Sequence, residues 1–181
     1  MLGPTLVGST VTLAPIKPEH LSHYLEWFAD AEVTRFLMRD TPPTLKDEEA
    51  WFERVARSEQ DVIWGLFVEG THIGSTGIHQ IDWRNRRGMT GILIGDRTWW
   101  GRGIAGDSHV LRTRYAFEEL GLQKLVTQVC DGNTASRRAL ERVGYRTVGI
   151  YRRHEFRRGQ WWDVWIGELL RDEWLVRQPA G

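Results

Sequence analysis

Residues 99–107 read W-W-G-R-G-I-A-G-D and stand between an apolar run, G-I-L-I-G at 91–95, and a segment with helical spacing. This order predicts a strand, a glycine-rich turn and the start of a helix. Gly101 and Gly103 would let the backbone approach a ligand closely, and the first helical turn leaves N–H groups free for an anion such as a phosphate or pyrophosphate. A plain strand-to-helix turn explains the two glycines equally well.

Two other phosphate-binding loops can be compared with this turn. A P-loop requires a Gly-Lys pair, which the sequence lacks. The dinucleotide fingerprint fits as Gly101, Gly103 and Gly106 and remains a competing interpretation. A dinucleotide fold, however, begins with this turn and then repeats strand-helix-strand units, whereas here the turn comes late and mostly strand-like sequence follows it.

Composition limits the classes of function. The chain has 181 residues, which favours a single domain over residues 1–181. Lys and Arg equal Asp and Glu at 24 each, and this balance argues against nucleic acid as a partner. A lone cysteine, no signal-like N-terminus and no apolar run of membrane-spanning length predict a cytoplasmic protein without a membrane partner.

Hydrophobic periodicity predicts alternating groups of strands and helices. A tight hairpin at Gly70 and Thr71 joins the second and third strands, and a right-handed crossover makes the fourth and fifth strands parallel. The expected helices cover 18–29, 44–58 with a Thr44 cap, 104–120 and 131–144. The expected strands cover 6–14, 62–69, 72–82, 89–95, 123–130, 145–151 and 160–170.

The resulting order, β-α-α-β-β-β-α-β-α-β-β, carries W-G-R-G-I-A at 100–105 and N-T-A-S-R-R-A-L-E-R-V-G-Y at 133–145. In this order and spacing the chain resembles the GNAT superfamily of acyl-CoA-dependent N-acetyltransferases, most closely its ribosomal-protein-alanine N-acetyltransferase-like branch. The resemblance implies an α/β fold with a mixed sheet whose fourth and fifth strands splay apart. It also implies acetyl-CoA as co-substrate and no metal.

The same resemblance implies where the cofactor binds. Backbone N–H groups of the glycine turn would hold the pyrophosphate of coenzyme A, the fourth strand would bond its pantetheine arm, and the asparagine of N-x-x-S would contact it. The cofactor-binding residues so implied are Ile92, Leu93, Ile94, Trp100, Gly101, Arg102, Gly103, Ile104, Ala105, Asn133 and Ser136.

Catalytic residues are less clear, because two residues common in the family are absent. Met89 stands where the branch often has a glutamate base, and Leu140 where the superfamily often has a tyrosine acid. We therefore expect His79 and Asp82 to serve as base, and Ser136 to stabilise the leaving thiolate. An N–H near Leu93 would stabilise the oxyanion. The single cysteine, Cys130, is expected to be a buried thiol rather than a nucleophile.

The acceptor remains open at this stage. Phe36, Met38 and Arg39 lie in an apolar, irregular stretch and are expected to line the substrate mouth. The resemblance implies acetyl transfer by direct attack of a primary amine in a ternary complex, whether the amine is a protein N-terminus, a polyamine, an aminoglycoside or another small amine. Alternatives are a catalytically degenerate acyl-CoA sensor or scaffold and a dinucleotide-binding module. A homodimer is compatible with the sequence.

Overall fold

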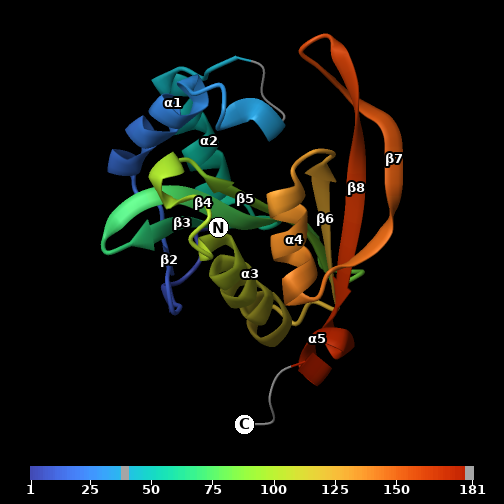
Figure 1. Cartoon of the computed structure of the whole chain (residues 1–181). Coiled ribbons are helices and arrows are strands. Elements are labelled where there is room, and N and C mark those ends of the chain that lie inside the picture. Colours follow the sequence, from blue (N-terminus) through green and yellow to red (C-terminus); the bar gives the residue numbers. More distant parts are fainter. Residues whose placement is uncertain (38–40, 178–181) are drawn as a thin grey trace.

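The computed structural model describes residues 1–37 and 41–177. Its strands form one mixed sheet in the order β1-β2-β3-β4-β5-β6-β8-β7, in which only β5 and β6 are parallel neighbours. Figure 1 shows the sheet running through the molecule, with the long β7–β8 hairpin at one end. The predicted mixed α/β class is confirmed.

The N-terminal segment differs from its prediction. Residues 6–14 form two short antiparallel strands, β1 (Leu6–Val7) and β2 (Thr12–Ala14), instead of one. The carboxylate of Asp107, far along the chain, accepts hydrogen bonds from the backbone N–H groups of Thr10 and Val11. These bonds hold the turn between β1 and β2. This tertiary contact is invisible to a local strand pattern.

Two helices follow as predicted. Helix α1 (Leu21–Ala29) is preceded by a 3₁₀ turn at Pro18–His20, and α2 (Leu45–Arg57) begins with a capping box formed by Thr44 and Asp47. The capping box satisfies N–H groups that the first helical turn leaves free. A second 3₁₀ turn, Thr34–Phe36, lies between the helices.

The antiparallel meander is also confirmed, with one correction at its first turn. It consists of β3 (Val62–Val68), β4 (Thr71–Asp82) and β5 (Arg87–Ile94). The tight turn lies at Glu69 and Gly70, whose φ angles of 50° and 80° are both positive. Hairpins favour such turns because their twist matches that of the flanking strands.

The C-terminal half contains the predicted parallel crossover. Helix α3 (Ile104–Arg114) continues into a wider π turn at Tyr115–Glu119 and leads to β6 (Lys124–Cys130). The remaining elements are α4 (Thr134–Val143), β7 (Arg146–Arg157), β8 (Gln160–Leu170) and α5 (Arg171–Arg177). Strand β7 extends six residues past its predicted end, because its pairing with β8 resumes at Glu155, after an irregularity that follows Tyr151, and runs to Arg157.

Successive side chains of the middle strands point to opposite faces of the sheet, and each face carries its own hydrophobic core. Ile63 and Leu93 pack with α1 and α2, whereas Val62 and Trp64 pack with the cluster that includes α3, as a period of two requires. In the described part of the chain, no helix combines the length and apolar character needed to cross a bilayer.

Candidate active site

Strands β5 and β6 begin as neighbours and then separate. Their pairing runs only from Arg87 with Lys124 to Thr90 with Thr127, although both strands continue beyond it. The predicted splay is therefore confirmed. A channel of about 210 Å³ lies where the strands part, lined by Phe36, Leu37, Thr90, Gly91, Ile92, Thr127, Gln128, Val129, Cys130, Asn133, Ser136 and Leu140.

The backbone groups of β5 alternate between its two neighbours. The carbonyl of Thr90 accepts from Thr127 of β6, whereas the Gly91 carbonyl accepts from Thr76 of β4. Because N–H and C=O of one strand residue point to the same side, those of Ile92 face the channel.

The prediction that the backbone of Leu93 serves the cofactor and the oxyanion needs a correction. A Cβ on Gly74 of β4 would lie 2.0 Å from the Leu93 carbonyl, so the backbone of Leu93 faces β4 and not the channel. The N–H that can serve an oxyanion here is therefore that of Ile92. Farther along, the Ile94 carbonyl already accepts a hydrogen bond of 2.8 Å from the Trp100 indole.

The glycine-rich turn has the geometry of an anion-binding loop. Gly101 and Gly103 have φ angles of 75° and 81°, and Gly103 is the N-cap residue of α3. The guanidinium of Arg102 lies 4.9 Å from the Trp99 ring centre. Nothing lies within 4 Å of a Cβ built on Gly101 or Gly103, so a ligand could approach the backbone there. The N–H groups of the first turn of α3, which begins with Ile104 and Ala105, follow directly and could bind an anion.

The start of α4 forms another wall of the channel. The side-chain oxygen of Asn133 accepts from the backbone N–H of Ser136 at 3.2 Å, so Asn133 caps the helix. Cys130 also lines this channel, and burial raises the pKa of its thiol. A protonated, buried thiol is a poor nucleophile.

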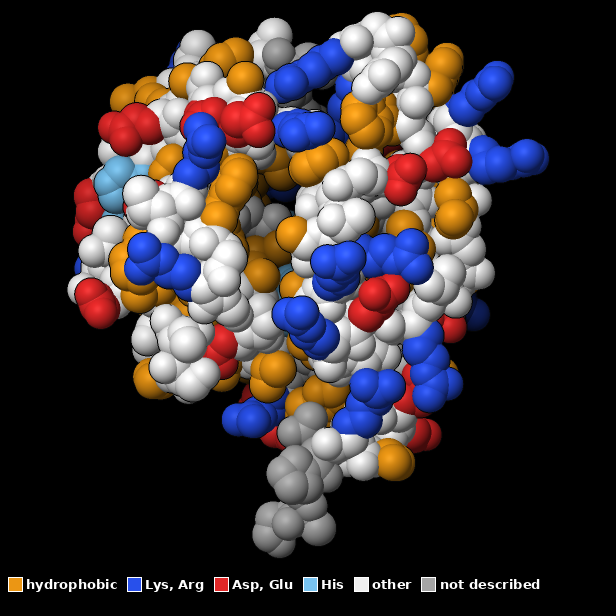
Figure 2. Space-filling model, in the orientation of Figure 1, with side chains coloured by type: hydrophobic (Ala, Val, Ile, Leu, Met, Phe, Trp, Pro, Cys, Tyr) orange, Lys and Arg blue, Asp and Glu red, His pale blue; other side chains and the backbone are white. Residues whose placement is uncertain are grey.

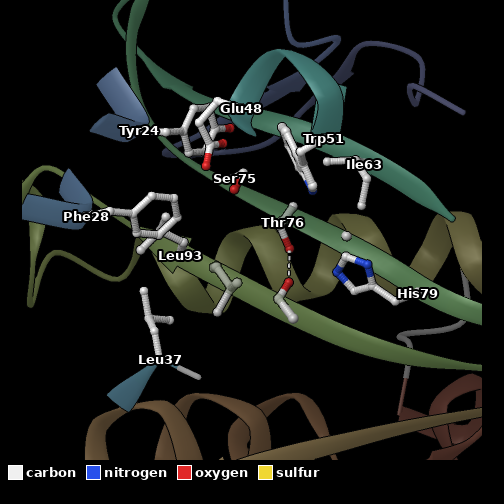
Figure 3. A pocket seen from close by; sticks show the side chains of 13 residues that line it. Tyr24, Phe28, Leu37, Glu48, Trp51, Ile63, Ser75, Thr76, His79 and Leu93 are labelled. Carbon is white, nitrogen blue, oxygen red and sulfur yellow. Dashed lines mark hydrogen bonds between the residues drawn. The ribbon is translucent and has the colours of Figure 1, made fainter. Parts of the chain in front are cut away.

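A second cavity, of about 460 Å³, lies on the other side of β5. Figure 3 shows it between α1, α2 and the strands β4 and β5, with Tyr24, Phe28 and Trp51 on its walls. Leu37, Gly91 and Ile92 border both cavities, so these open onto opposite sides of the same short piece of strand. The other lining residues are Glu48, Ile63, Ser75, Thr76, Gly77, His79 and Leu93.

Seen from outside, the two halves of the molecule enclose a hollow. Figure 2 shows hydrophobic side chains inside it and Lys and Arg side chains beside it, over α3 and α4.

His79 lies beside Gly91, in the part of β5 that borders both cavities. A Cβ on Gly77 or on Gly91 would lie 2.9 Å or 3.4 Å from its Nε2, so the ring covers both glycines. Its Nδ1 lies 3.4 Å from a carboxylate oxygen of Asp61. One ring nitrogen thus faces a carboxylate and the other faces the cavity.

Asp82 does not join His79, contrary to the sequence expectation. Its carboxylate accepts from the backbone and side chain of Asn85 and pairs with Arg87, so it stabilises the β4–β5 turn. A register irregularity after His79, with a positive φ of 50° at Gln80, separates the two residues. Sequence analysis missed Asp61, which no motif marks.

Of the three residues expected at the substrate mouth, only Phe36 can be placed. Its ring meets the Trp162 ring edge-on at 6.4 Å between centres and lines the channel. Met38 and Arg39 lie outside the described residues.

The His79 ring is expected to titrate below pH 6.5. Burial, the largest cause, lowers its pKa, the charge of Arg112 lowers it further, and the charge of Asp61 acts in the opposite direction. Heteronuclear NMR of the imidazole nitrogens, assigned with His79→Gln, measures this directly. In Asp61→Asn the midpoint should fall further, and a wild-type midpoint above 6.5 would show that the charge of Asp61 outweighs the partial burial of the ring.

Within residues 1–37 and 41–177, no group of three or more His, Cys, Asp or Glu side chains is arranged so that it could hold a metal ion.

Comparisons with known proteins agree with this geometry. Residues 10–146 match the acetyltransferase (GNAT) domain family. The chain is 28% identical to N-acetyltransferase p20 of Bacillus licheniformis over 94% of its own length and 98% of the relative's. It is 24% identical to N-acetyltransferase YoaA of Bacillus subtilis, covering 93% and 97%.

Solved structures show the same fold. A spermidine N-acetyltransferase from Vibrio cholerae, solved with CoA and spermine, superimposes with a TM-score of 0.85 over 92% of this chain and 98% of its own, at 17% identity. The family match covers most of the chain, and the separated β5 and β6 strands, the glycine turn and the α4 cap stand in the family's order. The chain belongs to the GNAT family and is an N-acetyltransferase.

Proposed function

We propose that this protein transfers an acetyl group from acetyl-CoA to a primary amine by direct attack, with His79 as general base. The observation that carries the proposal is the junction at Gly91 and Ile92. There the channel between β5 and β6 meets the aromatic cavity, and the His79 ring lies over the same strand.

The donor side fits acetyl-CoA, which supplies the reactive thioester. The Ile92 carbonyl faces the channel and can accept a hydrogen bond from an amide N–H of the pantetheine arm, as it would from a neighbouring strand. The N–H groups after Gly101 and Gly103 suit its pyrophosphate. Asn133 and Ser136 lie along the same channel.

The chain's own groups can move the protons that the reaction requires. His79 Nε2 accepts a proton from the attacking nitrogen as that nitrogen bonds to the carbonyl carbon, and Asp61 holds the ring through Nδ1. The Ile92 N–H stabilises the negative charge on the carbonyl oxygen. When the carbon–sulfur bond breaks, the Ser136 hydroxyl donates a hydrogen bond to the thiolate.

The acceptor cavity favours an amine attached to a compact apolar group. Aromatic rings of Tyr24, Phe28 and Trp51 line it, and its size lies in the ordinary range for small-molecule sites. Glu48, only 2% exposed, adds a carboxyl group to this wall. Aromatic faces and a carboxyl together suit an ammonium carried on a hydrocarbon or an aromatic ring.

A non-catalytic acyl-CoA sensor needs only the donor channel. The imidazole of His79, held by Asp61 and facing the second cavity at the junction, has no role in such a sensor. This arrangement therefore favours the enzyme.

Thiol release from acetyl-CoA tests the proposal. The amine panel should hold an arylalkylamine, a polyamine, an aminoglycoside and a peptide with a free N-terminus, with CoA and NAD binding measured by calorimetry. We expect CoA binding and fastest turnover with the arylalkylamine. CoA binding without turnover of any amine would support the sensor, and NAD binding without CoA binding would support the dinucleotide module.

Ser136→Ala is expected to lower kcat roughly ten- to a hundredfold, because a hydrogen bond to a charged group contributes about 1.5–3 kcal/mol. The Kd for CoA should stay close to that of the wild type. The exposed hydroxyl of Thr134 on the same helical turn provides the control, and Thr134→Ala should leave kcat unchanged. Equal kcat values for the two variants would remove Ser136 from the mechanism.

A further inference from the structure

Arg112 is a buried cation directly behind the junction of the two cavities. It lies on α3 with no exposed surface. One guanidinium nitrogen donates to the Thr76 hydroxyl at 2.7 Å and to the Gly91 carbonyl at 2.8 Å. The other reaches Nδ1 of His109 at 3.1 Å, which must accept because a guanidinium has no acceptor.

All three of these partners are neutral. Burial and the charge of Arg112 keep the pKa of His109 well below its ordinary value, so its ring carries no charge. The Tyr145 hydroxyl is a further neighbour of the guanidinium. Among the residues that the structure describes, no carboxylate pairs with Arg112. A buried charge without a counterion is costly, so a role that needs positive charge at this point would explain it.

The peptide unit between Gly91 and Ile92 links Arg112 to the channel. Its carbonyl oxygen faces β4 and accepts from both Arg112 and Thr76. Its N–H, at the opposite end of the same planar group, faces the channel, where the pairing of β5 with β6 has already ended. Hydrogen bonds to a carbonyl polarise the peptide and make its N–H a stronger donor.

We propose that Arg112 is a positioning residue for acetyl transfer: its guanidinium polarises the Gly91–Ile92 peptide so that the Ile92 N–H stabilises negative charge on the acetyl oxygen. The inference rests on the proposed function. Arg112, although fully buried on the other face of the sheet, would then affect the rate of the chemical step.

A purely structural role makes a different prediction. If Arg112 only fastens α3 to β4 and β5, its loss lowers stability and weakens the binding of both substrates as the strand shifts. If it polarises the peptide, its loss lowers kcat while KM for the amine and Kd for CoA change little, because the oxyanion forms only during the reaction.

The test compares Arg112→Met, which keeps volume and loses charge, with Arg112→Lys, which keeps the charge. Thr113→Val, the adjacent buried position of α3, is the matched control. In Arg112→Met we expect kcat to fall roughly tenfold or more, a fraction of the 10²–10³ that follows loss of a whole oxyanion donor. Arg112→Lys should recover part of that loss, and Thr113→Val should match the wild type.

A second readout needs no turnover. In the free protein, the amide proton of Ile92, observed by NMR after isoleucine labelling, should move upfield in Arg112→Met and stay near its wild-type shift in Thr113→Val. Should Arg112→Met fail to fold, Thr76→Val carries both measurements, since it removes one donor to the Gly91 carbonyl and an acceptor of Arg112. It should show the same changes at smaller amplitude.

The outcomes separate the two proposals. A folded Arg112→Met or Thr76→Val with wild-type kcat and an unmoved Ile92 amide overturns the inference and leaves the proposed function intact. A loss of kcat that Arg112→Lys does not recover, or that parallels weaker CoA binding, also overturns it. Wild-type protein that turns over no amine overturns the proposed function, and the inference with it.

Discussion

His79→Ala is expected to lower kcat/KM about 10²–10⁴-fold near neutral pH, the range that a positioned general base contributes. The ring lies over Gly91 at the junction of both cavities, and Asp61 fixes its other nitrogen. Because the pKa of His79 is lowered, the ring is neutral and able to accept a proton at pH 7. Steady-state thiol release between pH 5 and 9 measures the effect.

The pH dependence of kcat/KM provides a second test of the role of His79. In the wild type, kcat/KM should fall as the pH drops through the lowered pKa of His79, and this acidic limb should vanish in His79→Ala. His154→Ala, on exposed β7, is the matched control and should keep both the rate and the limb. An unchanged profile in His79→Ala would assign proton removal to water.

Trp64→Ala should lower the free energy of unfolding by about 3–5 kcal/mol, as large-to-small changes at buried aromatic residues do. The Trp64 side chain is fully buried, its indole N–H donates to the Pro4 carbonyl at 2.9 Å, and its ring meets that of Tyr115 edge-on at 5.2 Å. A Cβ on Gly3 would lie 2.0 Å from the indole, so the N-terminal segment packs directly on it.

Urea denaturation followed by circular dichroism measures this loss. Trp161→Ala is the control, because Trp161 is 57% exposed and contacts chiefly the Phe156 ring. Its effect should stay within about 0.5 kcal/mol, as for most surface substitutions. Similar losses for both tryptophans would contradict the assignment of Trp64 to the core. The expected loss is a large part of the free energy of unfolding of a typical domain, which is roughly 5–15 kcal/mol.

Local signals in the sequence were sufficient for most of the fold. The Thr44 and Asp47 capping box, the Gly103 and Gly144 helix ends and the short meander connections each depend on neighbouring residues. The donor side that we propose rests on signals of the same kind. Its glycine turn and its N-x-x-S cap are contiguous motifs that chain order places beside the two separated strands.

The aromatic cavity that we propose for the acceptor could not be predicted in this way, because it is assembled from residues on different elements. Tyr24 and Phe28 come from α1, Glu48 and Trp51 from α2, and His79 from β4. No single stretch carries them as a motif. Arg112 is a similar case, since its helical position does not reveal that Thr76 and Gly91 receive its hydrogen bonds.

The pairing of His79 with Asp61 shows the physical reason most clearly. Near the hairpin turn, Val68 pairs with Thr71, but beyond an irregularity the register shifts by one, so that Val62 pairs with Ile78 and the next positions along are Asp61 and His79. The extra residue is Ile73, whose carbonyl accepts from the N–H groups of Gly95 and Asp96 at the end of β5.

The sequence alone therefore determined the family fold and the parallel crossover, because both follow from local propensity and contiguous motifs. Only the tertiary structure decided that Asp61, and not Asp82, holds His79. A one-residue bulge fixed by a third strand sets that register, and in a sheet one residue decides which side chains face each other.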